Sequence, residues 1–404
     1  MEINVPKLRF KEFNDEWKIS KVGEITSKVG SGKTPKGGNS VYVSDGIMFI
    51  RSQNVLNGKL SLDDVVYISE EENDRMKSTQ IKANDVLINI TGASIGRCCK
   101  VPADFKNGNL NQHVCIIRPN KDNSEFIMNY MISDKIQKQI FSFQAGGNRE
   151  GLNFEQIKGM TIGMPSIQEQ ERIANFLTKV DRIIEKQDEK VKNLEKYKKG
   201  MMQKIFSQEI RFKDENGEAY PEWEIKRVED VANIQVGFTP DTKNDSFWDG
   251  DIKWLSIAGM NSKYIFDGNK RISNEALGKR ELIPKNTLVM SFKLTIGRLA
   301  IIKEPMITNE AICQFYWKNK NIINEYMYQY LDSIRIESFG CRAAKGITLN
   351  NESLNSIIVK LPCLDEQNKI ADLLNNIDCI HQEELNKLNE LKQWKKGLLQ
   401  QMFV

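Results

Sequence analysis

Two short motifs contain residue types that could hold a phosphate or a metal ion. The first is Gly30–Thr34, which reads Gly-Ser-Gly-Lys-Thr like the end of a phosphate-binding loop. Such a loop needs another glycine at the position of Ser27, and a helix must begin directly after the threonine. Pro35, Gly37 and Gly38 follow instead. We therefore do not expect a nucleotide to bind here.

The second motif imitates a nuclease site in which carboxylates hold a catalytic metal ion. A Pro-Asp dipeptide ends at Asp241, and Asp251 and Lys253 follow it at Asp-x-Lys spacing. In the internal alignment described below, the two acids face Lys36 and Gly46, which cannot bind a metal in this way. The motif is therefore explained by chance in a sequence with 28% charged residues.

Other catalytic signatures are missing from the sequence. There is no Asn or Asp before two prolines, as adenine methyltransferases have, and no Gly-x-Gly-x-x-Gly after a strand. The two histidines lie far apart, and none of the seven cysteines forms a Cys-x-x-Cys pair. This spacing excludes the usual zinc and redox motifs and suits free thiols packed as small hydrophobic residues. We predict that the chain is not an enzyme and holds no metal or cofactor itself.

The remaining candidates are polar side chains in loops that could read nucleic acid. Arg51-Ser52-Gln53-Asn54 follows an apolar run, and arginine pairs with guanine edges while glutamine and asparagine pair with adenine. Arg97 and Arg298 each end an Ile-Gly-Arg turn. Ordinary solvated loops, or internal salt bridges of the two arginines, would explain the same residues. The full set of candidate DNA-binding residues is Lys33, Thr34, Arg51, Gln53, Asn54, Thr91, Ser94, Arg97, Asn111, Gln112, His113, Asn148, Arg149, Phe238, Thr239, Lys293, Arg298, Asn309, Arg342 and Lys345.

Length and composition limit the kinds of protein that could carry these loops. A chain of 404 residues suggests two or three domains, and 40% hydrophobic residues are enough for packed cores. The net charge of +4 permits a nucleic-acid partner without requiring one. No stretch reaches the ~18 consecutive apolar residues of a membrane span, and the first residues have no apolar signal core. We expect a soluble cytoplasmic protein without a membrane partner.

An internal repeat organises the chain. The segment from Pro165 to Ala174 returns at Pro362 to Ala371, and the match continues without a gap almost to the C-terminus. Upstream the agreement is weaker but keeps its order, as expected when insertions lie in surface loops. The matched segments there are Arg9-Phe10-Lys11 with Arg211-Phe212-Lys213, Glu16-Trp17 with Glu222-Trp223, Gly32-Lys33-Thr34-Pro35 with Gly237-Phe238-Thr239-Pro240, Ile95-Gly96-Arg97 with Ile296-Gly297-Arg298, and Asn111 with Asn309.

The well-matched part of each repeat predicts a long helix. Ser166 and Glu169 form a Ser-x-x-Glu capping box directly after Pro165, which predicts the start of a helix. Apolar residues then step by four and three, which is the pattern of a coiled-coil seam, interrupted by Gln187 and Glu384. Two copies of one helix most simply pack against each other, antiparallel if a pseudo-two-fold axis relates them. The alternative is that each helix packs only on its own domain.

The divergent part of each repeat reads as mixed helix and strand. Short β-rich runs are expected at Val86–Ile90, His113–Ile117, 288–292 and 312–317, and helices at 125–143 and 324–338. The predicted fold class is α+β, with two mixed α/β domains joined by two long antiparallel helices. The predicted boundaries are 1–164 and 208–361 for the domains and 165–207 and 362–404 for the helices.

This duplicated arrangement resembles the DNA-specificity subunit of type I restriction–modification systems. The resemblance rests on the start Pro6–Phe10, the two Gly-x-Thr-Pro loops, both Ile-Gly-Arg turns, the two helix starts and the paired Lys-Lys-Gly segments at Lys198 and Lys395. It covers essentially the whole chain, and the two-copy arrangement is more specific than any single motif.

The resemblance implies two target-recognition domains that each read half of a split site in double-stranded DNA, with the helices as a spacer. It also implies assembly with two modification subunits that bring S-adenosylmethionine, and with restriction subunits that use ATP and Mg²⁺. The family's specificity chain carries no cofactor and no catalytic residues. Its DNA contacts differ between members, so the resemblance indicates regions and not individual residues.

Two other classes remain open at this stage. A coiled-coil scaffold would bind partners without sequence-selective, salt-sensitive retention of DNA. A metal-dependent nuclease would cleave DNA by itself, and Asp241→Ala would abolish the cleavage.

Overall fold

The computed structural model describes residues 5–144, 151–343 and 346–404. They form two compact units, and each unit combines most of one sequence repeat with the end of the other. The first unit consists of residues 1–188 and 386–404, and the second of residues 189–385. Each long helix therefore begins in one unit and ends in the other.

The first unit is built on a four-stranded antiparallel sheet and a smaller three-stranded sheet. The larger sheet has the order β2 (Thr26–Ser31), β10 (Val114–Pro119), β7 (Val86–Asn89), β8 (Cys98–Lys100). The smaller sheet has the order β6 (Val66–Ile68), β3 (Ile47–Ile50), β9 (Gly108–Leu110), with β3 and β9 parallel. The antiparallel pairs β1 (Lys18–Lys21) with β11 (Thr161–Met164) and β4 (Val55–Leu56) with β5 (Lys59–Leu60) complete its strands. Its helices before the first long one are α1 (Glu70–Arg75), α2 (Ser124–Ile132), α3 (Asp134–Gln144) and α4 (Phe154–Gly159), with 3-10 turns η1 (Val22–Glu24), η2 (Gly38–Val41), η3 (Ser52–Asn54), η4 (Lys77–Thr79) and η5 (Gly92–Ser94).

The second unit repeats this topology. Its larger sheet has the order β13 (Ala232–Val236), β20 (Ile312–Trp317), β17 (Thr287–Ser291), β18 (Leu299–Ile302), β15 (Tyr264–Ile265). Its smaller sheet has the order β16 (Lys270–Ile272), β14 (Ile252–Leu255), β19 (Ile307–Thr308), and β12 (Glu224–Arg227) pairs with β23 (Ile358–Leu361). A further pair joins β21 (Cys341–Ala343) and β22 (Gly346–Thr348). Its short helices are α6 (Val228–Val231), α7 (Asn274–Leu277), α8 (Asn324–Ser333) and α9 (Asn351–Asn355), with 3-10 turns η6 (Asp245–Trp248), η7 (Ile257–Gly259) and η8 (Ile336–Phe339).

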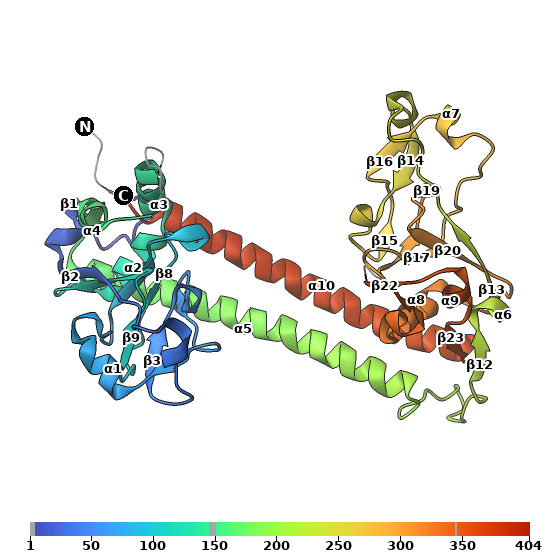
Figure 1. The fold of residues 1–404 in the computed structure, drawn as a ribbon, viewed down its shortest axis with the longest axis horizontal. Helices are drawn as coiled ribbons and strands as arrows, with labels where there is room; N and C mark the ends of the chain where they lie inside the picture. Colours follow the sequence, from blue (N-terminus) through green and yellow to red (C-terminus); the bar gives the residue numbers. More distant parts are fainter. Residues whose placement is uncertain (1–4, 145–150, 344–345) are drawn as a thin grey trace. The chain divides into compact units, whose positions relative to one another are not determined.

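The two long helices are α5 (Ile167–Phe206) and α10 (Leu364–Gln401) (Figure 1). Within the second unit they pack antiparallel, because Lys198 pairs with Asp378 at 2.6 Å while the earlier Lys190 pairs with the later Glu384 at 3.1 Å. In the first unit Lys395 pairs with Asp181, the equivalent ion pair. The prediction of paired antiparallel helices is confirmed.

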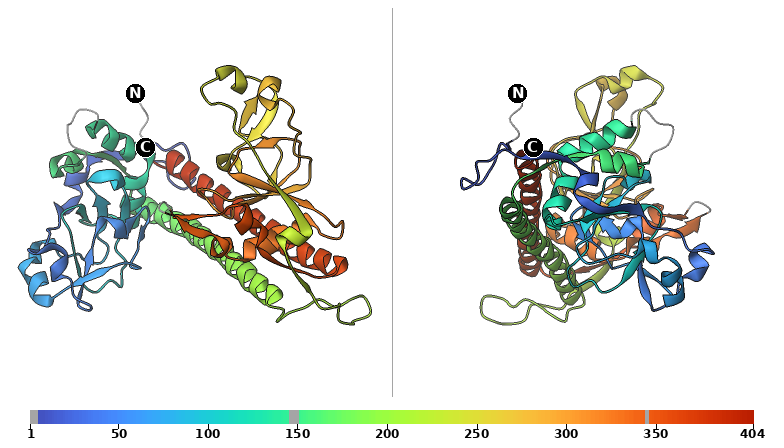
Figure 2. Two further views of the ribbon diagram at one scale, coloured as in Figure 1. Left: turned by 45° about the vertical axis from the view of Figure 1, so that its right-hand side comes forward. Right: turned by 90° about the vertical axis from the view of Figure 1, so that its left-hand side faces the viewer.

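Each long helix ends in the aromatic core of the unit in which it finishes. In the first unit the ring of Phe403 lies 4.9 Å from Tyr130 and 5.5 Å from Phe126. In the second unit Phe206 lies 5.3 Å from Tyr330 and 6.1 Å from Tyr326. Figures 1 and 2 show that the three-stranded sheet of each unit lies away from the C-terminal end of the long helix that finishes in that unit. One loop of that sheet still reaches α10 in the second unit, because Lys263, which lies between β14 and β16, donates to Asn375.

Two details of the predicted helices were wrong. The helix expected over 125–143 is split into α2 and α3, because Ser133 is extended and its hydroxyl donates to the carbonyl of Tyr130 at 2.6 Å. Ser333, the last residue of α8, donates to the carbonyl of Tyr330 at 2.6 Å and the next residue, Ile334, is extended, so that helix stops short of the predicted residue 338. A serine hydroxyl can replace the backbone donor that would otherwise continue the helix.

The capping box at the start of α5 is only half formed. Ser166 Oγ accepts from the backbone N–H of Glu169 at 3.4 Å, but the Glu169 carboxylate binds Arg9 through both oxygens at 2.8 Å. The same pairing joins Arg211 to Glu366 in the second unit, where the capping serine is replaced by Cys363. A buried ion pair, and not a local cap, thus fixes the start of both helices.

Candidate nucleic-acid interface

Three loops of the first unit gather the predicted DNA-reading residues around one hollow. The loops follow β3, follow β7 and precede β10, at neighbouring strand ends of the two sheets. The hollow has a volume of about 500 Å³ and is lined by Ser52, Gln53, Thr91, Gly92, Ala93, Ser94, Arg97 and His113. The structure therefore brings together Gln53, Thr91, Ser94, Arg97 and His113 from three separate segments.

Buried polar contacts hold these loops in place. The amide of Asn89 is buried and donates to the carbonyl of Ser52 at 2.8 Å, which ties the loop after β7 to the loop after β3. Thr91 Oγ1 and His113 Nδ1 lie 2.7 Å apart, and Asn111 Oδ1 accepts from the backbone N–H of His113 at 3.1 Å. Such contacts preorganise a binding surface before a ligand arrives.

The predicted readers next to β3 differ in what they offer a ligand. Gln53 is exposed, and its amide donates to the carboxylate of Asp64. Arg51 is half-buried and donates to the backbone and side-chain oxygens of Asp64 at 2.9 and 3.3 Å. Asn54 is only 2% exposed, and its amide donates to the carbonyls of Ser61 and Asp64. Asn54 therefore shapes the turn and has almost no surface left for a base.

Lys33 and Thr34 are exposed beside the same loops. Only a glycine at position 32 lets this segment pass so close to the end of β9, because a Cβ there would lie 1.7 Å from the carbonyl oxygen of Leu110. The backbone N–H of Lys33 donates to that same carbonyl at 3.1 Å, which brings Lys33 next to Asn111. Strand β2 runs through Gly30 and turns follow Thr34, so this segment is not a phosphate-binding loop between a strand and an α-helix. Gln112 is exposed and Asn111 half-buried in the same corner.

The second unit presents the corresponding loops. Asn309 Oδ1 accepts from the backbone of Ala311 at 3.2 Å, as Asn111 does two residues before His113. Arg298 is exposed, and its Nη1 donates to the carbonyl of Ile257 at 3.1 Å, which ties the loop after β17 to the turn η7. Lys293 is exposed in the same loop. The structure thus brings the predicted residues Lys293, Arg298 and Asn309 to one corner.

A different side chain closes the turn after β14. Gly259 stands in η7 where Asn54 stands in η3, and a Cβ at Gly259 would lie 2.6 Å from Oδ1 of Asn269. That oxygen accepts from the backbone N–H of Ser256 at 2.9 Å, as Asn54 Oδ1 accepts from Arg51. The turn is kept although the asparagine comes from another segment.

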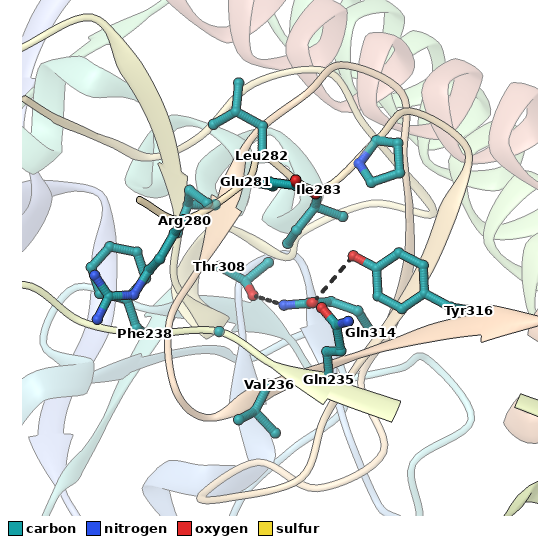
Figure 3. Close-up of a pocket in the computed structure, with 13 residues that line it drawn as sticks. Gln235, Val236, Phe238, Arg280, Glu281, Leu282, Ile283, Thr308, Gln314 and Tyr316 are labelled. Carbon is teal, nitrogen blue, oxygen red and sulfur yellow. Dashed lines mark hydrogen bonds between the residues drawn. The ribbon is translucent and has the colours of Figure 1, made fainter. Parts of the chain in front are cut away.

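Phe238 and Thr239 lie beside a second polar hollow, which sequence reasoning missed. It has a volume of about 610 Å³ and is lined by residues that include Gln235, Phe238, Arg280, Thr308, Gln314 and Tyr316. Figure 3 shows the Arg280 guanidinium beside the Phe238 ring, 3.9 Å from its centroid, and Tyr316 directed toward Gln314. Thr239 donates to Glu310.

A polar residue within a buried strand could have revealed this hollow. Gln314 is 3% exposed and donates to Thr308 Oγ1 at 3.0 Å, and burial raises the pKa of the neighbouring Tyr316 phenol. A buried glutamine inside an apolar run usually serves a structural or binding role. The β-rich run predicted at 312–317 assigns no such role to Gln314.

Four predicted residues cannot be placed as side chains. Asn148, Arg149 and Lys345 lie outside the described residues. Arg342 is described by its backbone alone, in β21.

The residues of the two rejected motifs have structural partners. Lys253 donates to the carbonyl of Phe266 at 3.1 Å, and Asp241 accepts from the backbone of Lys243 at 2.9 Å. Among the described residues, no group of three or more His, Cys, Asp or Glu side chains is placed to hold a metal ion. Burial raises the pKa of the thiols of Cys99, Cys115 and Cys313 to about 12, so these cysteines pack as neutral side chains.

Comparison with known proteins identifies the family. The model of the type I restriction–modification DNA specificity domain matches the chain twice, at residues 14–196 and 220–393. The chain therefore belongs to the type I restriction–modification DNA specificity family. The two matched regions correspond to the two sequence repeats and to the repeated sheet topology.

Individual relatives agree with this assignment over nearly the whole chain. A protein of Methanocaldococcus jannaschii, assigned as the specificity subunit of the type I restriction enzyme MjaX, is 23% identical over 415 residues, covering 98% of this chain and 95% of its own length. The fold is similar to the S subunit of a type I system from M. genitalium, with a TM-score of 0.57 at 15% identity and 99% of both chains covered. A chain from a structural study of complex assembly in a type I system has a TM-score of 0.60 at 16% identity, covering 95% of this chain and 96% of that chain.

The long helices are amphipathic and not membrane spans. Within the described part of the chain, no helix is both long and apolar enough to cross a membrane.

Proposed function

We propose that each unit reads one half of a bipartite site in double-stranded DNA. The observation that carries this proposal is that one loop frame occurs twice with different side chains. The frame includes Asn111 and Asn309, and Gly32 and Gly237, in equivalent contacts. The exposed residues on the frame differ, for example Gln53 in the first unit and Ala258 in the second. Two related frames with different readers suit two different half-site sequences.

The side chains at the two corners are those that recognise bases and phosphates. Arginine and glutamine bind base edges in the major groove, and lysine binds phosphate. The net charge of +4 is modest for a protein that would hold DNA alone. We therefore infer that partner subunits neutralise part of the phosphate charge.

The proposed partners are two modification subunits and the restriction subunits of the same system, acting on DNA in the cytoplasm. In this assembly the modification subunits carry S-adenosylmethionine and methylate adenine, and the restriction subunits use ATP and Mg²⁺. This chain supplies sequence recognition and performs no catalysis. The proposal agrees with the family to which the chain belongs.

The experiment that tests this function is co-expression with the modification subunit, followed by mapping of methylated adenines. We expect one bipartite sequence to be methylated. Exchange of residues 8–164 for the same region of another family member should change one half of the sequence and preserve the other. Altered bases in both halves would contradict one reader per unit, and an absence of sequence-selective methylation would leave the scaffold function instead.

The helices α5 and α10 are proposed to set the spacing between the half-sites. Insertion of seven residues into each helix, at positions that keep the seam in register, adds whole helical turns to both. The methylated sequence should then keep both halves and acquire a longer spacer. If the spacer is unchanged, the helices do not determine it.

A further inference from the structure

Leu294 is an exposed leucine in a backbone conformation that leucine rarely adopts. Its φ is +63°, and 93% of its surface is exposed. The other described non-glycine residues with positive φ are Asn84, Gln208 and Asn286, whose side chains are polar. Asparagine tolerates this region because its side chain can bond to the nearby backbone, and leucine has no such compensation.

The loop around Leu294 is pinned and imposes this conformation. The backbone N–H of Gly297 donates to the carbonyl of Ser291 at 2.8 Å, and the N–H of Ser291 donates to Arg298 at 2.9 Å. Ser291 Oγ accepts from the N–H of Arg298 at 3.0 Å and donates to the carbonyl of Thr295. Only residues 292–296 are left to close the loop. The leucine is therefore held outward at a conformational cost.

The first unit has a glycine at the equivalent position. Counted from the strand ends Asn89 and Ser291, Gly92 matches Leu294 and has a φ of +69°; the first unit's loop is one residue longer before the Ile-Gly-Arg turn. A Cβ added at Gly92 would meet no atom within 4 Å. Glycine adopts this conformation without strain. Where the backbone of this loop takes a positive φ, the first unit thus has a glycine and the second unit has an exposed leucine.

Leu294 lies in the loop that carries the second unit's candidate DNA contacts. Lys293 and Arg298 flank it and are exposed, and Arg298 ties the loop to the turn η7. That turn presents the exposed methyl group of Ala258 where the first unit presents the amide of Gln53. This corner combines cations with small apolar groups, while the first unit's corner consists mainly of hydrogen-bonding groups.

Among base edges in the major groove, the C5 methyl group of thymine is the apolar feature that leucine or alanine can contact. We propose that Leu294 is a specificity-determining residue of the second unit and contacts the C5 methyl group of a thymine in its half-site. This inference rests on the proposed function. The strain at Leu294 is retained because the position serves recognition, in line with strained residues at binding sites generally.

The test uses the complex with the modification subunit and the DNA sequence found by methylation mapping. Each thymine of the second half-site is replaced in turn by deoxyuridine, which removes only the methyl group. With the natural chain, one replacement should lower the methylation rate at limiting DNA about fourfold, the effect of losing one buried methyl contact. With Leu294→Gly, thymine and uracil should be methylated equally at that position.

Glycine is chosen because it suits the observed φ, so the variant should be at least as stable to heat as the natural chain. Ile225→Ala is the matched control, since Ile225 is 66% exposed on β12, and it should keep the thymine preference.

A half-site without thymine, no effect of uracil, or a thymine preference that survives in Leu294→Gly would overturn the proposal. If Leu294→Gly keeps the thymine preference but binds DNA more weakly, the leucine inserts between bases and does not contact a methyl group. If no sequence is methylated at all, the proposed function itself fails.

Discussion

The two candidate reading corners share a frame but differ in how their side chains are held. In the first unit, Asp64 engages both Arg51 and Gln53, and Thr91 is joined to His113. In the second unit the equivalent turn carries Ile257 and Ala258, and the neighbouring loop exposes Leu294. One corner is a hydrogen-bonded network and the other is an apolar tip between cations. A duplicated fold can thus keep its loop geometry while its recognition chemistry changes.

The largest expected difference between the units lies at the starts of the long helices. Glu366 is fully buried and accepts from Arg211 at 2.9 Å and from the Trp223 indole at 2.9 Å. Glu366→Ala leaves the Trp223 indole N–H without its partner and removes the buried carboxylate partner of Arg211, which keeps its hydrogen bond to the carbonyl of Pro221 at 2.6 Å. The free energy of unfolding of the second unit should therefore fall by about 3 kcal/mol. Thermal unfolding of the chain measures this loss.

The counterpart in the first unit sharpens that prediction. Among the described residues, Arg9 is the one side chain that donates to the Glu169 carboxylate, and the buried Trp17 indole N–H has no partner. Glu169→Ala therefore leaves one fewer donor newly unpaired and should destabilise its unit less than Glu366→Ala does. Equal losses in the two variants would show that the indole hydrogen bond contributes nothing.

The next largest effect is expected at the paired arginines. Arg97→Ala should reduce discrimination in the first half-site about tenfold or more, as loss of an arginine contact to a guanine edge does. Arg298→Ala should act on the second half-site alone. Methylation rates on DNA with single substitutions in each half measure both effects. Arg75→Ala, which removes an exposed arginine paired with Glu71 on α1, is the control and should change neither half.

The smallest effect is expected at the Gly-x-Thr-Pro loops, where Lys33 in the first unit is replaced by Phe238 in the second. If Lys33 binds phosphate, Lys33→Ala should weaken binding of the complex uniformly across sequences and reduce the salt dependence of log K by about one ion. Phe238→Ala should leave the salt dependence unchanged. Binding measured over a range of salt concentrations separates the two, and equal slopes would remove this distinction between the units.

The sequence was sufficient to predict the parts of the fold that depend on local pattern. The apolar 4-3 ladder predicts α5 and α10, and the repeat predicts that one topology occurs twice. The breaks at Ser133 and Ser333 escaped prediction because a single serine hydroxyl decides them. The contact between Arg9 and Glu169 joins residues 160 positions apart, which no local pattern reveals.

The candidate site was predicted in its residue types and only partly in its geometry. Gln53, Arg97 and His113 do line one hollow, but Asn54 turned inward because its amide satisfies backbone groups of the turn. Arg280 and Tyr316 were missed since one follows α7 and the other lies in a strand, far from any polar loop motif. Which polar residue faces a ligand depends on the tertiary neighbours that compete for it.

The contact of Phe403 with Trp17, Phe126 and Tyr130 has a consequence for the order of events during synthesis. Residues 1–188 of the first unit are translated before the second unit, yet the aromatic core of the first unit includes a side chain translated after the whole second unit. That core stays incomplete throughout translation of the second unit. The nascent first unit therefore exposes an aromatic surface while residues 189–385 are translated.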